Sequence, residues 1–210
     1  MISTYFFDID GTLLDSAPDI SAAVCEVCPG VPEPTVRRYI GRSLAEMFAD
    51  FYPGITKTEI EHLSGMYTER YRARAHRDTR VFPGVAPMLA ALPGRKSTAT
   101  TKRTATAAAV LELFGLRTYF DHIQGSDNGR YKPDPAILLE AIEVLGVNPQ
   151  ECLMVGDSPA DIEAGRRAGM HTCAVAWGYG DPAELQSLEP DLWIEGPHQL
   201  LSAACQFGGE

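Results

Sequence analysis

The sequence lacks any long apolar run: none of its stretches approaches the ~18 consecutive apolar residues that a membrane span needs. Its start lacks the basic segment and apolar core of a secretory signal, so we expect a cytoplasmic protein without membrane attachment. The five cysteines are few and odd in number, which favours reduced thiols over a disulfide framework. Internal repeats and low-complexity segments are also missing, which excludes repeat and fibrous architectures.

Positive charge is scarce as well. The 210 residues include 18 Lys and Arg against 28 Asp and Glu, which gives a formal net charge of −10. A chain this acidic is a poor match for sequence-independent binding of nucleic acid or of an anionic membrane, because both require a positive field. A small anionic substrate is still compatible with this charge, since one site can be locally positive.

The apolar pattern changes twice along the chain. Residues 4–7 are β-branched and aromatic and predict a short buried strand. From residue 15 to about residue 80, apolar residues recur at helical spacing and no strand-like run occurs. After Phe82-Pro83-Gly84, short strands alternate with helices. The predicted strands are 97–101, 122–125, 152–156, 171–175 and 191–194, and the predicted helices are 85–91, 103–114, 134–145, 159–168 and 197–204.

Strands that alternate with helices predict an α/β fold, with a Rossmann-like parallel sheet covered by helices on both faces. Because the first strand resembles the later ones, we interpret the helical stretch as an insertion. We therefore expect an α/β core domain formed by residues 1–14 and 82–210, and an inserted helical domain formed by residues 15–81.

Polar side chains follow four of the predicted strands. Parallel sheets bind ligands at the carboxyl ends of their strands, so we expect these side chains to converge on one edge. They are Asp8 and Asp10 after the first strand, Thr100, Thr101 and Lys102 after the second, Ser126, Asp127 and then Lys132 after the third, and Asp157 and Asp161 after the fourth.

Asp8 and Asp10 are two residues apart, so both carboxylates can point into one site, and Gly11 allows a sharp turn after them. Two crowded carboxylates repel each other, and one pKa should rise unless a cation lies between them. Magnesium suits this place because it prefers hard oxygen ligands and keeps several waters. The alternative is a surface turn that happens to be rich in Asp and Gly.

Asp157 and Asp161 are spaced to share one face of a helix, with Ser158 as the predicted N-cap and Pro159 as the first helical residue. Capping and solvation are the alternative reading for both acids. Lys132 has the alternative of an ordinary surface lysine, but in an acidic site it would supply the positive charge that phosphate binding needs.

Four short motifs stand in the order found in phosphatases of the haloacid dehalogenase superfamily, which this sequence resembles over nearly its whole length. They are Asp8-Ile-Asp10-Gly-Thr-Leu-Leu, Thr100-Thr-Lys, Lys132-Pro and Gly156-Asp157-x-x-x-Asp161. Asp15-Ser-Ala-Pro-Asp-Ile20 and Trp177-Gly-Tyr-Gly180 are most similar to the phosphoglycolate phosphatase branch.

The resemblance implies a role for each matching residue. Asp8 would be the nucleophile that forms an aspartyl-phosphate, and Asp10 would be the general acid and then the base for water. Thr100, Thr101 and Lys132 would hold the phosphoryl group, although Thr101 stands where many relatives have Asn. Magnesium would be held by Asp8, the main-chain carbonyl of Asp10 and Asp157, with Asp161, Gly11 and Thr12 in support.

Other charged and thiol groups carry weaker signals. Arg70, Arg72, Arg74, Arg77 and Arg80 form a basic cluster, which we interpret as a solvated helix end, with attraction of an anionic substrate as the alternative. Arg42 lies in a turn of the insertion and would meet a substrate carboxylate if the insertion closes over the site. Cys25 and Cys28 have no partner set for zinc, so we interpret them as helix-packing residues.

The resemblance therefore predicts a magnesium-dependent phosphatase, with the insertion as a helical cap. The substrate would be a small phosphorylated metabolite, with 2-phosphoglycolate first and sugar phosphates or nucleoside monophosphates as alternatives. We expect a monomer or a homodimer. A phosphomutase is the main rival, but such mutases carry a lysine where this chain has Ile40. The rival from another class is a non-catalytic binding protein, which would commonly lack Asp8.

Overall fold

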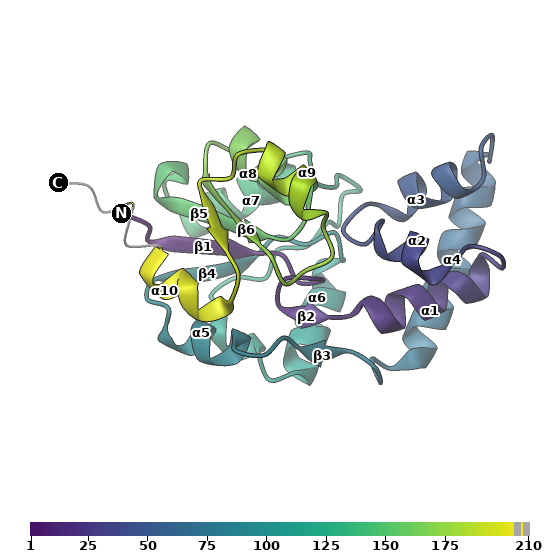
Figure 1. Cartoon of the computed structure of the whole chain (residues 1–210), viewed down its shortest axis with the longest axis horizontal. Coiled ribbons are helices and arrows are strands. Elements are labelled where there is room, and N and C mark those ends of the chain that lie inside the picture. Colours follow the sequence, from purple (N-terminus) through teal and green to yellow (C-terminus); the bar gives the residue numbers. More distant parts are fainter. Residues whose placement is uncertain (204–206, 208–210) are drawn as a thin grey trace.

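One five-stranded parallel sheet organises the computed structural model, which describes residues 1–203 and 207 (Figure 1). Its strand order is β4-β1-β5-β6-β7. β1 pairs with β4 and with β5, so Phe7 lies level with Thr98 on one side and with Val155 on the other. The predicted parallel α/β sheet is confirmed. The strands are β1 (Thr4–Phe7), β4 (Arg95–Thr98), β5 (Cys152–Gly156), β6 (His171–Val175) and β7 (Leu192–Ile194).

Helices cover both faces of this sheet because its central strands β1 and β5 are apolar on both sides. Phe7 and Val155 pack against one group of helices, and Phe6 and Met154 pack against another on the opposite face. The first group is α5 (Val85–Ala91), α6 (Thr104–Leu113) and α10 (Leu200–Ala203), and the second is α7 (Ala136–Leu145) and α8 (Pro159–Arg167). Shorter elements are α9 (Pro182–Ser187) and the 3-10 turns η1 (Arg117–Tyr119), η2 (Pro149–Glu151) and η3 (Pro197–Gln199).

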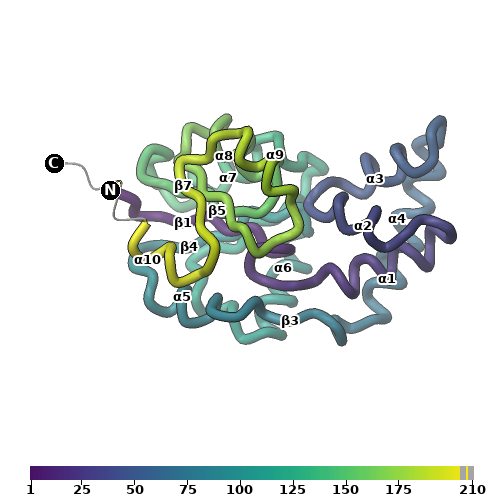
Figure 2. Tube along the Cα trace, viewed as in Figure 1, coloured from purple at the N-terminus to yellow at the C-terminus, as the bar shows by residue number. Residues whose placement is uncertain are grey.

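Four helices form a separate helical lobe beyond the carboxyl ends of the strands (Figure 2). They are α1 (Ala17–Val27), α2 (Glu33–Arg37), α3 (Leu44–Phe51) and α4 (Lys57–Arg74). Their buried apolar residues make a cluster of their own, in which Phe48 and Met47 are the most enclosed large side chains. Ser43 and Thr56 begin α3 and α4 with reciprocal capping boxes. None of the helices in the described part of the chain has the length and apolar character needed to cross a membrane.

A two-stranded antiparallel ribbon joins the helical lobe to the sheet and was not predicted. It consists of β2 (Leu14–Asp15) and β3 (Arg80–Val81), with Leu14 opposite Val81. The expectation of no strand in this stretch was wrong because two-residue strands carry no hydrophobic period. β2 crosses the first predicted domain boundary and β3 ends at the second, so the two chain crossings between sheet and lobe run side by side.

Three more elements differ between the prediction and the structure. Residues 122–125 do not form a strand, and their pairing is a single bridge between Ser97 and His122. The predicted final helix divides into η3 and α10, and its last residue, 204, lies outside the described residues. α9 was not predicted, because its six residues are too short for a helical period.

Candidate active site

The candidate residues follow the carboxyl ends of adjacent strands, on the side of the sheet that faces the helical lobe (Figure 1). The backbone amide of Asp8 donates to Val155 O over 3.0 Å, and that of Ala99 donates to Phe7 O over 2.8 Å. These bonds continue the sheet by one residue and fix where the chains after β1, β4 and β5 leave it. Asp8 thereby lies at the end of the central strand, with Thr100 after one neighbouring strand and Asp157 after the other, and all three are buried.

Lys132 is the cation at the centre of this group. Its Nζ lies 2.9 Å from Asp8 Oδ1 and 2.5 Å from Asp161 Oδ1, and it donates to Ala99 O over 2.7 Å. Burial alone would lower the pKa of Lys132, but the two carboxylates outweigh it and raise the pKa above its ordinary value. Lys132 is therefore a permanent positive charge beside Asp8.

Two carboxylates of this buried group, those of Asp8 and Asp157, have raised pKa values. Burial, together with the nearby Asp161 and Asp10, raises the pKa of Asp8 to about 7 against the opposing effect of Lys132. Burial and the neighbouring Asp161 and Asp8 also raise the pKa of Asp157. One ammonium thus compensates the negative charge incompletely.

Asp157 is held by short contacts from two other segments. Its Oδ1 accepts from Thr12 Oγ1 over 3.0 Å, and its Oδ2 accepts from the Tyr179 amide over 2.8 Å. Gly11 has φ +87°, and a Cβ there would lie 2.1 Å from Asp157 Oδ2. Only glycine leaves room for this carboxylate, which gives Gly11 a reason beyond the turn itself.

The donor set of this site fits a hard divalent cation. Asp8, Asp157 and Asp161 each offer a carboxylate oxygen, and these atoms lie within 4.8 Å of one another. Buried oxygen ligands with an excess of negative charge are the surroundings that such a cation prefers. Asp161 is the most engaged of the three, because its Oδ2 also accepts from Ser158 N over 2.9 Å and from Ser158 Oγ over 2.6 Å. That engagement fits the supporting part predicted for Asp161.

The Asp10 side chain turns away from this set and toward the helical lobe. Its Oδ1 accepts a hydrogen bond from Ser16 Oγ, and its Oδ2 lies 2.8 Å from Lys102 Nζ. Lys102 also contacts Tyr71 of α4, with Nζ 3.4 Å from the hydroxyl and 5.1 Å from the ring centroid. Asp10 therefore has a cation of its own, distinct from Lys132.

Sequence reasoning placed Lys102 at a strand end but gave it no role, and it did not find Ser16 or Tyr71. The signal for Lys102 was its position directly after Thr100-Thr101. Thr100 is fully buried, and its Oγ1 accepts from the Lys102 amide over 3.3 Å, whereas Thr101 is only partly buried. Tyr71 had no signal, since its contact with Lys102 joins residues far apart in the sequence.

A cavity of about 330 Å³ lies between the helical lobe and the sheet. The lobe contributes Arg38 and Arg42 to its wall, and the other side contributes Lys132, Ser158 and Tyr179. The structure thus brings Arg42 to the same cavity as Lys132, and the Arg42 guanidinium stacks 5.2 Å from the centroid of the Tyr39 ring.

The loop after β6 joins the side of the sheet that carries the buried carboxylates to the lobe. Trp177 Nε1 donates to Thr12 O over 3.0 Å. The Tyr179 hydroxyl donates to Asp15 Oδ1 over 2.8 Å and accepts from the Ala17 amide over 3.0 Å. Tyr179 therefore fixes the start of α1 and, through its own amide, the Asp157 carboxylate. The sequence marks this loop only by its resemblance to the phosphoglycolate phosphatase branch.

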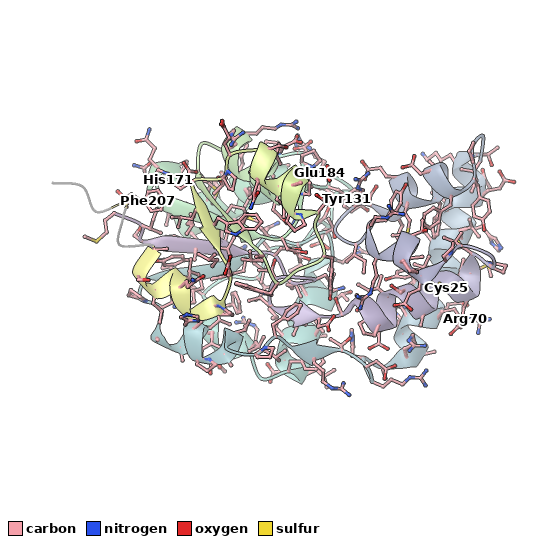
Figure 3. The ribbon with its side chains drawn as sticks, viewed as in Figure 1. Cys25, Arg70, Tyr131, His171, Glu184 and Phe207 are labelled. Carbon is pink, nitrogen blue, oxygen red and sulfur yellow. The ribbon has the colours of Figure 1, made fainter. Side chains whose placement is uncertain are left out.

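The basic cluster and the cysteines Cys25 and Cys28 lie apart from the buried carboxylates of the candidate site. Arg74 pairs with the buried Asp19 and with Asp78, each at 2.8 Å, so it anchors the end of α4. Figure 3 shows Arg70 and Cys25 on the outer side of the helical lobe, away from the sheet. Cys25 and Cys28 are free thiols in α1 and at its end.

Comparisons with known proteins agree with this geometry. A profile of the family described as haloacid dehalogenase-like hydrolase matches residues 5–175. The chain is 34% identical over 217 residues to phosphoglycolate phosphatase 1 of Pseudomonas aeruginosa, covering 95% of this chain and 79% of that one. It is 32% identical over 204 residues to phosphoglycolate phosphatase of Aquifex aeolicus, covering 93% of each chain. A haloacid dehalogenase-like hydrolase of Streptococcus pneumoniae superposes with a TM-score of 0.88 at 26% identity, covering 96% of this chain and 97% of that one.

Proposed function

The chain belongs to the haloacid dehalogenase-like hydrolase family, and from this premise we propose that it hydrolyses 2-phosphoglycolate through an aspartyl-phosphate intermediate. As an enzyme it is a phosphoric monoester hydrolase. The observation that carries the proposal is the buried group of Asp8, Asp157 and Asp161 around Lys132, at the carboxyl end of a parallel sheet. Phosphoryl transfer needs a positioned nucleophile and neutralised oxygens, and these residues supply both.

In the proposed reaction the Asp8 carboxylate attacks phosphorus, and the bond from phosphorus to the ester oxygen breaks. Asp10 gives its proton to the departing oxygen, so the product leaves as an alcohol. Water then attacks the phosphorus of the aspartyl-phosphate while Asp10 takes a proton from that water. Phosphate is released, and the Asp8 carboxylate is regenerated. Lys132 and Thr100 hold the phosphoryl oxygens, with Thr101 beside them.

We assign Mg²⁺ as the divalent cation. Asp8, the main-chain carbonyl of Asp10 and Asp157 would hold it, while Asp161, Gly11 and Thr12 support these ligands. Bound there, it would neutralise phosphoryl oxygens as negative charge builds up. The support for this assignment is the all-oxygen donor set, together with the raised pKa values of Asp8 and Asp157, which come first from burial and then from neighbouring carboxylates.

The helical lobe is proposed as a cap domain of residues 15–81 on a core domain of residues 1–14 and 82–210. Its support is a separate apolar cluster and the cavity that lies between it and the sheet. Arg42 in the wall of that cavity is the proposed contact for the part of the substrate beyond the phosphate. We further propose a cytoplasmic enzyme that acts as a monomer or a homodimer; the free thiols of the described cysteines suit a reducing compartment.

Phosphate release from a panel of monoesters tests this function. The panel contains 2-phosphoglycolate, a sugar phosphate and a nucleoside monophosphate, each assayed with Mg²⁺ and with EDTA. We expect release that requires Mg²⁺, favours 2-phosphoglycolate and falls by at least about 10³-fold in Asp8→Asn, which keeps the size of the side chain. No release from any ester would refute the phosphatase, and full activity of Asp8→Asn would refute the nucleophile.

A further inference from the structure

Tyr179 lies in the loop after β6, but its side chain belongs to the helical lobe. Its ring is partly buried and packs against the apolar cluster of α1 to α4. The Arg37 guanidinium of α2 lies 5.9 Å from the ring centroid. Trp177, two residues earlier in the same loop, packs against the apolar cluster of the sheet instead. The loop thus places one aromatic side chain in each part of the molecule.

The Tyr179 hydroxyl holds the point at which the chain enters the lobe. It donates to Asp15 Oδ1 of β2 over 2.8 Å and accepts from the amide of Ala17, the first residue of α1, over 3.0 Å. The first amides of a helix have no acceptor within the helix, and the side chain of Ser16, the N-cap residue, turns to Asp10. Burial raises the pKa of Tyr179, so the phenol keeps its proton for Asp15. The Tyr179 hydroxyl therefore serves as the acceptor at the start of α1.

The Tyr179 backbone amide holds the other end of the connection. It donates to Asp157 Oδ2 over 2.8 Å. The glycines on either side allow this approach, because a Cβ on Gly178 would lie 2.2 Å from Asp157 Cβ and one on Gly180 would lie 2.0 Å from Asp157 O. The loop therefore lies directly on Asp157, and a shift of either one moves the other.

One residue thus touches both a proposed metal ligand and the first turn of the lobe. Thr12, which donates to the other Asp157 oxygen, precedes β2 and lies on the sheet side of the ribbon. Its link to the loop, from Trp177 Nε1 to Thr12 O, stays on that side as well. The hydrogen-bonded path from Asp157 through this loop to α1 therefore runs through Tyr179.

This path can carry order from one end to the other. When the Asp157 carboxylate is fixed by a bound cation, the loop that rests on it is fixed too, and the Tyr179 hydroxyl passes this restriction to the start of α1. Without the hydroxyl the ring still packs in the lobe, but the start of α1 loses its polar contacts with the loop. Coupling between two places is reciprocal, so a fixed α1 also favours an occupied carboxylate site.

We propose that Tyr179 is a positioning residue that couples cation binding at Asp157 to the placement of the helical lobe. Occupation of the carboxylate site orders the start of α1, and the ordered lobe holds Asp157 in its ligand position. The coupling rests on the divalent cation of the proposed function and deepens it, because it gives that cation an influence on the lobe over the cavity.

Hydrogen–deuterium exchange of α1 measures this coupling without substrate or turnover. The full chain is compared in saturating MgCl₂ and in EDTA, and the amides of residues 20–27 are followed because they are bonded within the helix. We expect MgCl₂ to slow their exchange by about fivefold or more in wild type and by less than about twofold in Tyr179→Phe. A purely structural hydroxyl would instead change exchange by the same factor in both buffers and leave the MgCl₂ effect intact.

Tyr39→Phe is the matched control, because it removes a 3.1 Å hydroxyl hydrogen bond to Asp50 inside the lobe and leaves the loop after β6 unchanged. It should keep the wild-type MgCl₂ effect. Asp15→Ala is the second variant if Tyr179→Phe does not fold or its Tm no longer rises with MgCl₂, since it removes the acceptor of the hydroxyl without touching Asp157. We expect it to weaken the MgCl₂ effect at least about twofold.

Equal slowing in wild type and Tyr179→Phe overturns the coupling while the proposed phosphatase stands, and so does a wild type whose Tm rises with MgCl₂ but whose α1 exchange does not change. Loss of the effect in Tyr39→Phe as well overturns it, because any loosening of the lobe would then suffice. A wild-type Tm that does not respond to MgCl₂ overturns the cation assignment of the proposed function, and the coupling with it.

Discussion

Replacing Lys132 with methionine should cost more stability than replacing any other buried lysine of this chain. Met fills a similar volume but leaves Asp8 and Asp161 without their cation, and it removes the donor to Ala99 O. At 2.9 Å and an effective dielectric constant of about 20, the attraction between Lys132 and Asp8 is about 6 kcal/mol before desolvation. Removing one partner of a buried pair costs about 3–5 kcal/mol in practice.

We therefore expect Lys132→Met to lower the free energy of unfolding by about 3–5 kcal/mol in metal-free buffer. The loss should grow as pH rises above about 7, the raised pKa of Asp8. Since Lys132 holds that pKa down, the variant must keep Asp8 protonated to higher pH or bury its charge without a cation. Below that pH Asp8 is protonated in both proteins, and only the pair with Asp161 differs.

Urea unfolding in EDTA at pH 6 and pH 8 measures this effect. Lys96→Met serves as the control and should cost about 1 kcal/mol or less, because it removes only a hydrogen bond to Gly94 O. The double variant Lys132→Met/Asp161→Asn removes one positive and one negative charge that pair with each other. The free energy of unfolding that it loses should therefore be smaller than the sum of the two single losses by about 1–3 kcal/mol. A loss below about 1 kcal/mol for Lys132→Met, or strict additivity in the pair, would refute the reasoning.

Three further changes test separate contacts. Gly11→Ala places a Cβ against Asp157 and should abolish the rise in Tm that added MgCl₂ gives to wild type; an equal rise in the variant would contradict the fit. Burial would raise the pKa of Asp19, but hydrogen bonds led by Thr79 hold it below its ordinary value. Its stabilising effect is therefore present above about pH 4 and lost below it, so Asp19→Asn should lower Tm at pH 7 and flatten the fall in Tm between pH 5 and pH 3. Tyr179→Phe loses the hydroxyl's contacts with Asp15, Leu14 O and the Ala17 amide and should cost about 1–3 kcal/mol in urea unfolding. A cost near zero would show that the hydroxyl does not stabilise the start of α1.

Much of the fold could be predicted because it follows from local pattern. The apolar run of β5 and the helical spacing of α7 mark those elements without any tertiary information. The ribbon of β2 and β3 could not be found in this way, because its two short strands pair with each other across about 65 residues of sequence. The strand predicted at 122–125 does not form for a different reason: its residues meet β4 through one bridge instead of a ladder, which local pattern does not show.

The site divides along similar lines. Asp8, Asp157 and Lys132 were found because each follows a predicted strand or loop that leads to one edge of the sheet. Their roles in catalysis and metal binding remain predictions for the experiments above. The partners of Asp10 were out of reach, since Lys102 meets it from a different strand end and Tyr71 meets Lys102 from the helical lobe.

The sequence by itself determined the main strands and helices of the sheet domain, the family and the set of polar residues that meet at one edge, because these depend on residue type and spacing. Only the tertiary structure decided which charges pair. Lys132 lies with Asp8 and Asp161, and Lys102 lies with Asp10, although both lysines follow predicted strands and both are buried. That division depends on distances of a few ångströms between segments up to about 120 residues apart, and no local pattern encodes such distances.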